Sequence, residues 1–394
     1  MSSLPPLVEP GPELTLEEIG RYARHLSLPQ VGAIGQRRLK NARVLVIGAG
    51  GLGAPALQYL AAAGVGTLAI VDDDVVAVSN LQRQVIHTVA DLGRPKTDSA
   101  ADAVARLNPL VEVRTHAVRL TADNAVDLVG QYDLVLDGAD NFTTRYLVSD
   151  AATLTGRPCV WGSILRFQGQ VSVFWAGHGP TYRDLYPEAP PPGKVPSCAE
   201  GGVVGVLPAT IGSIMATEAI KLITGIGDPL VGRVLVHDAL EMTWRELRLD
   251  PDPDAVPVTA VNDLDLNFAV PGDAAVAPHE TLTAPELADL LERRNRGEAA
   301  FTLVDVREDW ERELVSIPGA RPVPLQELLD RREAALPAET RGADLVLHCK
   351  AGTRSATALA TLRPYFAGRE ENIRHLEGGV LAWVAQVEPE KPAY

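Results

Sequence analysis

The sequence predicts an α/β protein that combines a doubly wound parallel sheet with a second, smaller α/β domain. Short β-branched runs alternate with helical stretches, as at 43–47, 54–63 and 67–71, and this rhythm is typical of strand–helix–strand units. The same pattern returns after residue 300. A chain of 394 residues is also too long for one ordinary core, so we expect at least two domains.

Each expected element has its own signal. RVLVI at 43–47 and TLAIV at 67–71 are β-branched runs that predict buried parallel strands. Between them, glycines precede a helical stretch at 54–63. Further strands are expected at 134–136, 158–161, 302–306 and 345–348, and a helix over the run IGSIMATEAIKLITG.

The domain boundaries follow from composition. Residues 249–280 contain five prolines, seven acids and no Lys or Arg, and proline and like charge both oppose compact packing. The sequence therefore predicts a disordered leader at 1–13, a first domain at 14–248, an acidic linker at 249–280 and a second domain at 281–394.

Charge and cysteine content limit the possible partners. The chain has 36 basic and 51 acidic residues, a formal net charge of −15, which argues against direct nucleic-acid binding. Three cysteines cannot form a disulfide framework. The sequence shows neither a signal peptide nor a run of about 18 apolar residues. We expect a cytoplasmic protein without membrane contact, in which thiols are free to react.

A glycine loop follows the first expected strand. Gly48, Gly50 and Gly53 fit G-x-G-x-x-G, with Gly51 inside the motif, and Asp72 lies at the end of the next strand, 19 residues past Gly53. Such glycines let the backbone approach a phosphate, and the acid can accept hydrogen bonds from ribose. The pattern predicts a Rossmann-like nucleotide site. A nicotinamide dehydrogenase is the default interpretation, and a merely structural glycine turn is the alternative.

The residues that follow favour a triphosphate. SNLQRQ contains Arg83, GRPK contains Lys96, and DGADN places Asp140 after a strand. A triphosphate under attack needs cations where charge develops, and Asp140 could hold Mg²⁺ at the carboxyl end of the sheet. The alternative is that Arg83 and Lys96 are surface charges and that Asp140 only caps a helix.

A second reactive motif begins at Cys349, directly after the strand expected at 345–348. Its loop reads Cys349, Lys350, Ala351, Gly352, Thr353 and Arg354 and leads into an alanine-rich helix. Successive backbone N–H groups and a helix N-terminus favour a thiolate. Phosphate-ester cleavage and sulfane-sulfur transfer both use this design, and the short C-x4-R ring suits one sulfur atom better than a phosphoryl group.

These motifs carry a resemblance over about residues 16–247. GAGGLG, SNLQRQ, GRPK, DGADN and the later PSCAEGG resemble the MoeB/ThiF family, relatives of ubiquitin-activating enzymes. The resemblance implies Mg-ATP-dependent adenylation of the C-terminal Gly-Gly of a ubiquitin-like sulfur carrier. It places Asp72 at the ribose, Asn80, Arg83 and Lys96 at the phosphates, and Asp140 at Mg²⁺. Asp74, Ser79 and Asn141 would complete the nucleotide site.

Two further residues take roles from the same resemblance. Arg24 matches an arginine that family members insert into the partner subunit's site, which implies a homodimer. Cys198, in a Pro- and Gly-rich stretch that suggests a mobile loop, matches a cysteine that attacks the activated carboxyl group or receives sulfur. An unneeded thiol is the alternative for Cys198. Cys159 is expected in the core.

The C-terminal part resembles a single rhodanese domain over 283–383, with DVRE at 305–308 and LEGG at 376–379. The resemblance implies that Cys349 carries a persulfide, supplied by a cysteine desulfurase or by thiosulfate. Trp310 and Trp383, at helical positions, are expected to be packing residues.

One feature departs from the first family. Many members hold structural Zn²⁺ through two C-x-x-C pairs, and tetrahedral closure needs four such ligands. Here the first pair's region reads TYRD at 181–184, and the second has become the acidic linker. We therefore expect ATP and Mg²⁺ but no zinc.

Together the two halves predict adenylation of the carrier followed by sulfur transfer from the Cys349 persulfide, giving a carrier thiocarboxylate. Related carriers serve molybdopterin, thiamine, cysteine or tRNA-thiolation pathways. The alternatives are an activator for ubiquitin-like conjugation, a non-catalytic scaffold and, with least support, an NAD-dependent oxidoreductase.

Overall fold

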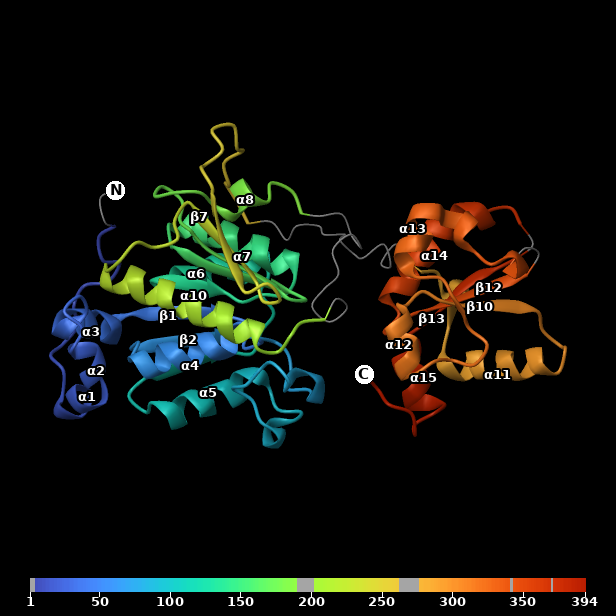
Figure 1. Ribbon diagram of the computed structural model, residues 1–394, viewed down its shortest axis with the longest axis horizontal. Helices are drawn as coiled ribbons and strands as arrows, with labels where there is room; N and C mark the ends of the chain where they lie inside the picture. Colours follow the sequence, from blue (N-terminus) through green and yellow to red (C-terminus); the bar gives the residue numbers. More distant parts are fainter. Residues whose placement is uncertain (1–3, 190–201, 262–275, 341–342, 370) are drawn as a thin grey trace. The chain divides into compact units, whose positions relative to one another are not determined.

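Two sheets organise the chain, one in each of two structural units (Figure 1). The computed structural model describes residues 4–189, 202–261, 276–340, 343–369 and 371–394. The first unit holds the described residues up to 261, and the second holds those from 276 onward. Among the described helices, none is both long and apolar enough to cross a membrane.

The first unit is built on an eight-stranded sheet with the order β3-β2-β1-β4-β5-β6-β7-β8. β1 to β5 run parallel, and β6, β7 and β8 continue the sheet antiparallel. The strands are β1 (Arg43–Ile47), β2 (Thr67–Val71), β3 (Glu112–His116), β4 (Leu134–Asp137), β5 (Cys159–Leu165), β6 (Gln168–Phe174), β7 (Arg233–Asp238) and β8 (Thr243–Arg248). The predicted doubly wound sheet is therefore confirmed.

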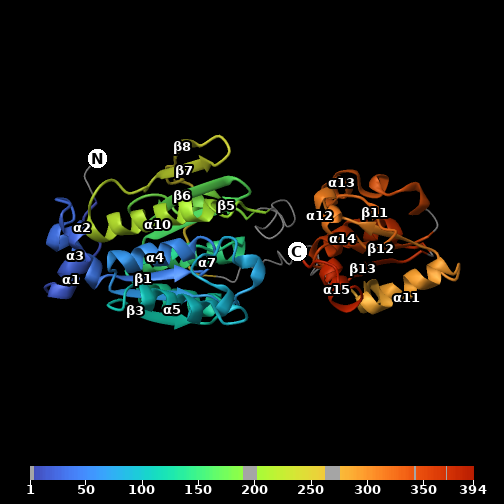
Figure 2. The same cartoon turned by 60° about the horizontal axis from the view of Figure 1, so that its bottom comes forward.

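Helices cover both faces of this sheet because its central strands are apolar on both sides. Side chains of α4, α5 and α10 pack on one face, in a cluster that contains Leu57, Ile211 and Val46, and those of α6 and α7 pack on the other, in a cluster that contains Leu147 and Leu45. Figure 2 shows α4 and α10 running side by side. The helices are α1 (Leu16–Arg21), α2 (Ala23–Leu26), α3 (Gly32–Asn41), α4 (Gly53–Ala63), α5 (Lys96–Leu107), α6 (Ala122–Gly130), α7 (Phe142–Thr155), α8 (Tyr182–Leu185) and α10 (Leu207–Thr224), with 3₁₀ turns η1 (Val78–Asn80) and η2 (Val89–Asp91).

The second unit has a parallel five-stranded sheet with the order β11-β10-β12-β13-β9. Side chains of α11 and α15 pack on one face and those of α13 and α14 on the other. The elements are η3 (Pro278–Glu280), β9 (Thr281–Leu282), α11 (Ala284–Asn295), β10 (Phe301–Asp305), α12 (Asp309–Leu314), β11 (Arg321–Pro322), α13 (Leu325–Arg331), η4 (Arg332–Ala335), η5 (Ala338–Thr340), β12 (Asp344–His348), α14 (Thr353–Phe366), β13 (Ile373–Leu376) and α15 (Gly379–Gln386).

Two segments differ from their sequence-based expectation. Within the expected leader, Leu7 N donates to Leu222 O at 2.9 Å and Val8 is buried, so residues 4–13 are ordered against the first unit. Proline has no backbone N–H group, so this proline-rich segment has few amides that need a hydrogen-bond partner. The expected linker is also attached at both ends. Leu249 N donates to Gly232 O at 2.9 Å, and Arg363 pairs with Glu280 at 2.8 Å. Residues 262–275 lie outside the described part of the chain.

Candidate active sites

A pocket of about 320 Å³ opens at the carboxyl ends of β1, β2 and β4. Ile47 pairs with Val71 on one side and with Asp137 on the other, so the three strands end side by side. β2 lies on one side of β1 and β4 on the other, so the order of the strands along the chain reverses at β1. Open α/β sheets bind their ligands at such a switch point. We call this cavity the Gly48 pocket. It is lined by Ile47, Gly48, Gly50, Gly51, Leu52, Val71, Asp72, Asp73, Asp74, Arg83, Gln84, Lys96, Val118, Arg119, Leu120, Gly138, Ala139, Asp140, Asn141, Thr144, Arg145 and Ile164.

The glycine loop is shaped by close contacts that only glycine permits. Gly48 has φ +87°, in the left-handed region. Gly53 begins α4, and a Cβ built on it would lie 1.8 Å from Gly48 O. Gly50 has more space, since its Cβ would lie 3.6 Å from Gln84 Nε2. Gly53 thus packs the helix against the loop, whereas Gly48 and Gly50 line the cavity itself.

Hydrogen bonds hold Ala49, inside this loop, from both sides. Ala49 N donates to Asp72 Oδ2 at 2.9 Å, and Ala49 O lies 2.9 Å from His87 Nε2. Because a carbonyl only accepts, Nε2 carries the ring proton, and Nδ1 accepts from Ser99 Oγ at 2.8 Å. Burial lowers the pKa of His87, which favours this neutral tautomer. His87 lies beneath the loop and was missed by the sequence analysis, which singled out no histidine.

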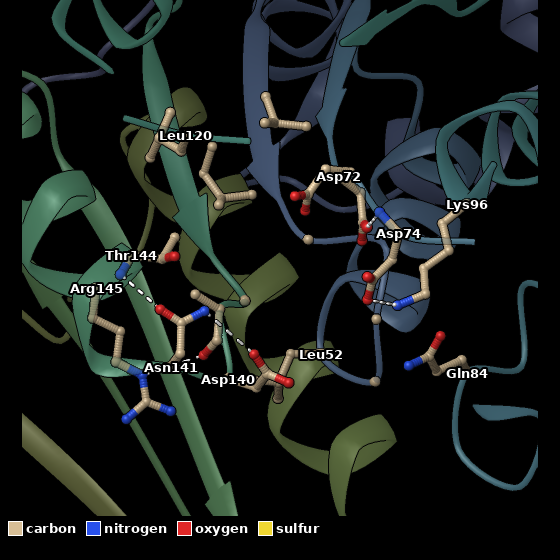
Figure 3. A pocket seen from close by; sticks show the side chains of 18 of the residues that line it. Leu52, Asp72, Asp74, Gln84, Lys96, Leu120, Asp140, Asn141, Thr144 and Arg145 are labelled. Carbon is tan, nitrogen blue, oxygen red and sulfur yellow. Dashed lines mark hydrogen bonds and ion pairs between the residues drawn. The ribbon is translucent and has the colours of Figure 1, made fainter. Parts of the chain in front are cut away.

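The charged groups of the pocket are held to different degrees. Lys96 is buried, and its Nζ lies 2.8 Å from Asp74 Oδ2 (Figure 3). Asp72 accepts from the amides of Ala49 and Asp74, both at 2.9 Å. Burial raises the pKa of Asp72, with the charge of Lys96 opposing. Asp140 is exposed, and its Oδ1 lies 3.5 Å from Asn141 Nδ2. Its oxygens therefore keep lone pairs for a ligand.

The structure brings together most of the predicted nucleotide-site residues. Nine of them line the pocket, namely Gly48, Gly50, Gly51, Asp72, Asp74, Arg83, Lys96, Asp140 and Asn141. Ser79 and Asn80 belong instead to η1, where Asn80 Oδ1 accepts from Ala77 N at 3.1 Å. Ser79 supports its neighbour, because Arg83 Nη1 donates to Ser79 O at 2.9 Å. Arg24 lies on α2 with its side chain exposed, outside the lining of the pocket in the same described chain.

Two lining residues were missed by the sequence analysis. Arg145 is buried, its Nε donates to Ala139 O at 3.2 Å, and its guanidinium lies 5.2 Å from the Phe142 ring centroid. Gln84 is buried with Oε1 lacking a partner among the described residues. The signal for Gln84 was available in SNLQRQ. Arg145 gave no comparable signal, because only the fold of α7 brings it to the pocket.

Asp137 is the last residue of β4 and is only 1% exposed, so almost no water reaches its carboxyl group to stabilise a charge. Burial raises its pKa to about 6, while the charge of Arg145 and the amide of Ala139, 3.0 Å away, oppose that rise. Desolvation of the carboxylate outweighs these stabilising partners. Arg145, which lines the pocket, therefore favours the ionised form of Asp137.

The second candidate site is the Cys349 loop, residues 349–354, in the second unit. β12 ends at His348 and α14 begins at Thr353, so the thiol lies at a strand end against a helix N-terminus. Cys349 is buried, and Gly352 N donates to its Sγ at 3.1 Å. Gly352 has φ +97°, which an L side chain rarely adopts. The loop thus points a backbone donor at the sulfur.

A hydrogen-bonded pair supports this loop from below. Ser355 Oγ donates to Gly352 O at 2.9 Å, and His375 Nδ1 lies 3.3 Å from the same oxygen atom of Ser355. Since the serine proton is used by Gly352, the ring nitrogen of His375 is the donor to Ser355. Both residues are buried, and burial lowers the pKa of His375.

Arg354, the last residue of the loop motif, is paired with an acid from another element. Its two terminal nitrogens donate to both oxygens of Glu311 at 2.7 Å, in a bidentate pair that is largely buried. Burial opposes ionisation of Glu311, but Arg354, the amide of Glu308 and the Tyr394 hydroxyl together outweigh it, and the pKa of Glu311 is lowered. Arg354 therefore fixes the loop to α12 as well as contributing charge.

The structure describes two of the three cysteines. Cys159 and Cys349 are free thiols. Cys159 lies in β5 and is 2% exposed, which confirms its core position. Cys198 lies outside the described residues, so its predicted role stays a prediction. Of the two tryptophans expected to pack, Trp383 is buried, whereas Trp310 is 53% exposed and packs edge-on against Tyr394, with the ring centroids 6.3 Å apart.

Residues 181–184, in the region of the family's first cysteine pair, are joined by hydrogen bonds to the acidic segment. Asp184 accepts from Thr181 N at 2.6 Å and from Asp252 N at 2.8 Å. It therefore caps α8 and holds residue 252 of the acidic segment at the same time. Within the part of the chain that the structure describes, no three His, Cys, Asp or Glu side chains gather as they would around a metal ion.

With the fold and both sites in place, comparison with known proteins defines the class. The chain belongs to the ThiF family, whose model matches residues 22–258, and a rhodanese-like domain matches residues 283–386. It is 54% identical to the probable adenylyltransferase/sulfurtransferase MoeZ of Mycobacterium tuberculosis over 100% of both chains. Adenylyltransferase and sulfurtransferase MOCS3 of Drosophila ananassae is 40% identical, covering 97% of this chain and 87% of the relative.

The first unit also has relatives without the second. The sulfur carrier protein adenylyltransferase of Thermus thermophilus is 55% identical over 61% of this chain and 90% of its own length. Among solved structures, E. coli MccB with MccA-N7isoASN matches with a TM-score of 0.55 at 20% identity, over 61% of this chain and 75% of MccB. That likeness supports the fold of the first unit.

Proposed function

We propose that this protein adenylates the C-terminal glycine carboxylate of a ubiquitin-like sulfur carrier with ATP and then converts that carboxylate to a thiocarboxylate with sulfur from Cys349. The observation that carries the proposal is the presence of two sites in one chain. The Gly48 pocket combines a glycine loop with Arg83, Lys96 and Asp140, and the Cys349 loop aims Gly352 N at a buried thiol.

ATP fits the Gly48 pocket. A Cβ at Gly51 would lie 3.2 Å from Pro208 Cβ, and one at Gly48 would lie 3.3 Å from Gly138 O, so the absence of side chains forms the cradle. Asp72 uses two of its lone pairs on backbone amides and keeps others for ribose hydroxyls. Lys96 can share its ammonium between Asp74 and phosphate because it has three N–H donors.

Mg²⁺ fits the carboxylate of Asp140, a hard oxygen ligand that faces the pocket (Figure 3). When bound with ATP, the ion would neutralise charge on the phosphate oxygens. Arg83 and Arg145 would add positive charge nearby. The carrier carboxylate oxygen then attacks the α-phosphorus, the bond to the β-phosphate oxygen breaks, and pyrophosphate leaves.

Sulfur transfer completes the sequence. The terminal sulfur of the Cys349 persulfide attacks the acyl carbon, AMP leaves, and an acyl disulfide joins the carrier to Cys349. A thiol, for which we propose Cys198, attacks the Cys349 sulfur, so that a disulfide forms on the enzyme and the carrier leaves as the thiocarboxylate. A cellular thiol then reduces the disulfide. A cysteine desulfurase or thiosulfate supplies the next sulfur.

The remaining features of the proposal concern assembly and setting. We place the protein in the cytoplasm as a homodimer in which Arg24 reaches the partner's nucleotide, without direct nucleic-acid contact. We also propose that it holds no structural zinc, since Asp184 ties together the segments that zinc would join. Metal analysis of the purified protein should find less than one tightly held Zn²⁺ per chain; one per chain would refute this point.

Adenylation is tested by exchange of labelled pyrophosphate into ATP. Exchange should require a carrier that ends in Gly-Gly, and the same carrier without its last glycine is the matched control. Exchange in the absence of any carrier, or with the shortened carrier, would contradict the proposal.

Sulfur transfer is tested with Cys349→Ser. The variant should retain pyrophosphate exchange and lose thiocarboxylate formation, which mass spectrometry detects as one sulfur in place of one oxygen on the carrier. Loss of both activities would show that the two units do not divide the work in this way.

A further inference from the structure

Tyr394 belongs to none of the sequence motifs, yet it contacts the charged groups around the Cys349 loop. Its ring centroid lies 4.7 Å from Lys350 Nζ, a cation–π distance. Its hydroxyl accepts from Arg307 Nη1 and donates to Glu311 Oε1 at 3.0 Å. Tyr394 thus contacts Lys350 directly, and it also contacts Glu311, the acid that binds Arg354.

Both partners of the hydroxyl are firmly held. Arg307 is completely buried, and its guanidinium pairs with Asp305 at the end of β10, with Nη2 to Oδ2 at 2.6 Å. Glu311 is 2% exposed, accepts from Glu308 N at 3.0 Å and binds Arg354 in the bidentate pair. A continuous path therefore runs from Asp305 through Arg307, the Tyr394 hydroxyl and Glu311 to Arg354.

This path matters because the loop must stabilise negative charge on sulfur when a persulfide forms and when it is attacked. Charges held at fixed positions do so without reorganising during the reaction. Burial raises the pKa of Tyr394, so the hydroxyl keeps its proton and remains a donor to Glu311. Phenylalanine at this position would keep the ring on Lys350 and would remove the hydroxyl that links Arg307 to Glu311.

We propose that Tyr394 is a positioning residue for sulfur transfer, holding Lys350 through its ring and Arg354 through Glu311. This inference rests on the proposed sulfurtransferase function of Cys349. It assigns the ring and the hydroxyl separate effects, which single substitutions can separate.

The experiment uses the full chain with thiosulfate and cyanide. The Cys349 thiolate takes the sulfane sulfur and releases sulfite, and cyanide then removes that sulfur as thiocyanate, which is measured. Tyr394→Phe should lower kcat about tenfold with KM for thiosulfate within about twofold, and Tyr394→Ala should lower kcat further, because misplaced groups slow the chemical step more than binding. Pyrophosphate exchange and the thermal unfolding of Tyr394→Phe should match those of the unaltered protein.

Two further variants sharpen the test. Tyr365→Phe is the matched control, since Tyr365 is a half-buried tyrosine of α14 packed against apolar side chains, and it should leave kcat unchanged. In a Glu311→Gln background, Tyr394→Phe should cost little more, because both changes interrupt one path. Full additivity, or unchanged kcat in Tyr394→Phe, would overturn the role of Tyr394 alone. A wild-type chain that forms neither thiocyanate nor a persulfide would overturn the sulfur chemistry itself.

Discussion

The charged residues at the Gly48 pocket differ in how many contacts they make within the protein. Lys96 is buried and paired with Asp74, and Asp72 supports two backbone amides. Substitution of either would disturb the fold as well as the ligand. Asp140 is exposed and has only a long contact to Asn141. It is therefore the residue at which binding chemistry can be changed with the least structural effect.

Asp140→Asn should lower the rate of carrier-dependent pyrophosphate exchange by about 10²- to 10³-fold, the range found when one charge-stabilising group is lost. Because the side chain is exposed, the free energy of unfolding should change by less than about 0.5 kcal/mol. Asp127→Asn, an exposed carboxylate on α6, is the control and should alter neither quantity. Exchange that survives in Asp140→Asn would remove Asp140 from the metal site.

We expect His348 to make the stability of the second unit sensitive to acid. It precedes Cys349 in a fully buried position, with Nε2 3.6 Å from Asp305 Oδ2. Burial lowers its pKa from 6.5 to about 4, although Asp305 partly opposes this and Arg307 adds to it. The folded state therefore holds a neutral ring, while the unfolded chain takes up a proton first as the pH falls.

We expect the stability of the second unit to fall by about 2 kcal/mol between about pH 7 and about pH 5, because each unit of pKa difference corresponds to about 1.4 kcal/mol. Hydrogen exchange of peptides that contain β10 and β12, followed in the full chain, measures this. His348→Gln should flatten the pH dependence, whereas substitution of the exposed His279 should not. An equally steep fall in His348→Gln would assign the effect to other groups.

At the scale of elements, the junction between the glycine loop and α4 separates packing from ligand binding. Gly53 lies where a Cβ would overlap Gly48 O, and Gly50 faces the cavity with more room. One motif therefore holds glycines for two different reasons. Gly53 keeps α4 against the loop, and Gly50 leaves the space in which we propose that phosphate binds.

Gly53→Ala should destabilise the first unit by about 1–3 kcal/mol, since overpacking of a tight contact costs about that much. Gly50→Ala should unfold at nearly the wild-type temperature and bind ATP at least about tenfold more weakly. Calorimetric unfolding and ATP titration of the two variants give the comparison. Equal loss of stability in both would mean that the loop acts as a single packing unit.

At the scale of the whole molecule, the two units carry separate cores and separate sites. The pocket of the first unit lacks Arg24 among its described lining residues, although the sequence predicts that this arginine assists phosphate transfer. An exposed arginine on a short helix can act on a second copy of the chain. Under the proposed homodimer, the adenylation site would be complete only after dimerisation.

Mixed dimers test this directly. Arg24→Ala and Asp140→Asn should each be inactive in pyrophosphate exchange. When the two are unfolded, mixed in equal amounts and refolded, about a quarter of wild-type activity should return, because half of the dimers would be mixed and each would contain one complete site. No recovery would place Arg24 in its own subunit's site, and full activity of Arg24→Ala by itself would place it outside catalysis.

Much of the candidate site could be predicted because its residues lie close to strand ends in the sequence. GAGGLG, Asp72 and Asp140 each follow a β-branched run, and parallel strands bring such positions to one edge. Arg145 and His87 could not be predicted in this way. His87 reaches the glycine loop from a connection, and Arg145 reaches the pocket from α7, both through contacts that only packing creates.

By itself, the sequence determined the two α/β units, the glycine loop after the first strand and the place of Cys349 directly after a strand, because local periodicity and motif spacing encode them. Tertiary structure alone decided which charges remain available to a ligand. It paired the partly buried Arg354 with the buried Glu311, left Asp140 exposed and placed Tyr394 on Lys350. The physical reason is that the environment of a charge depends on burial and partners from distant parts of the chain, and neither is written in the neighbouring residues.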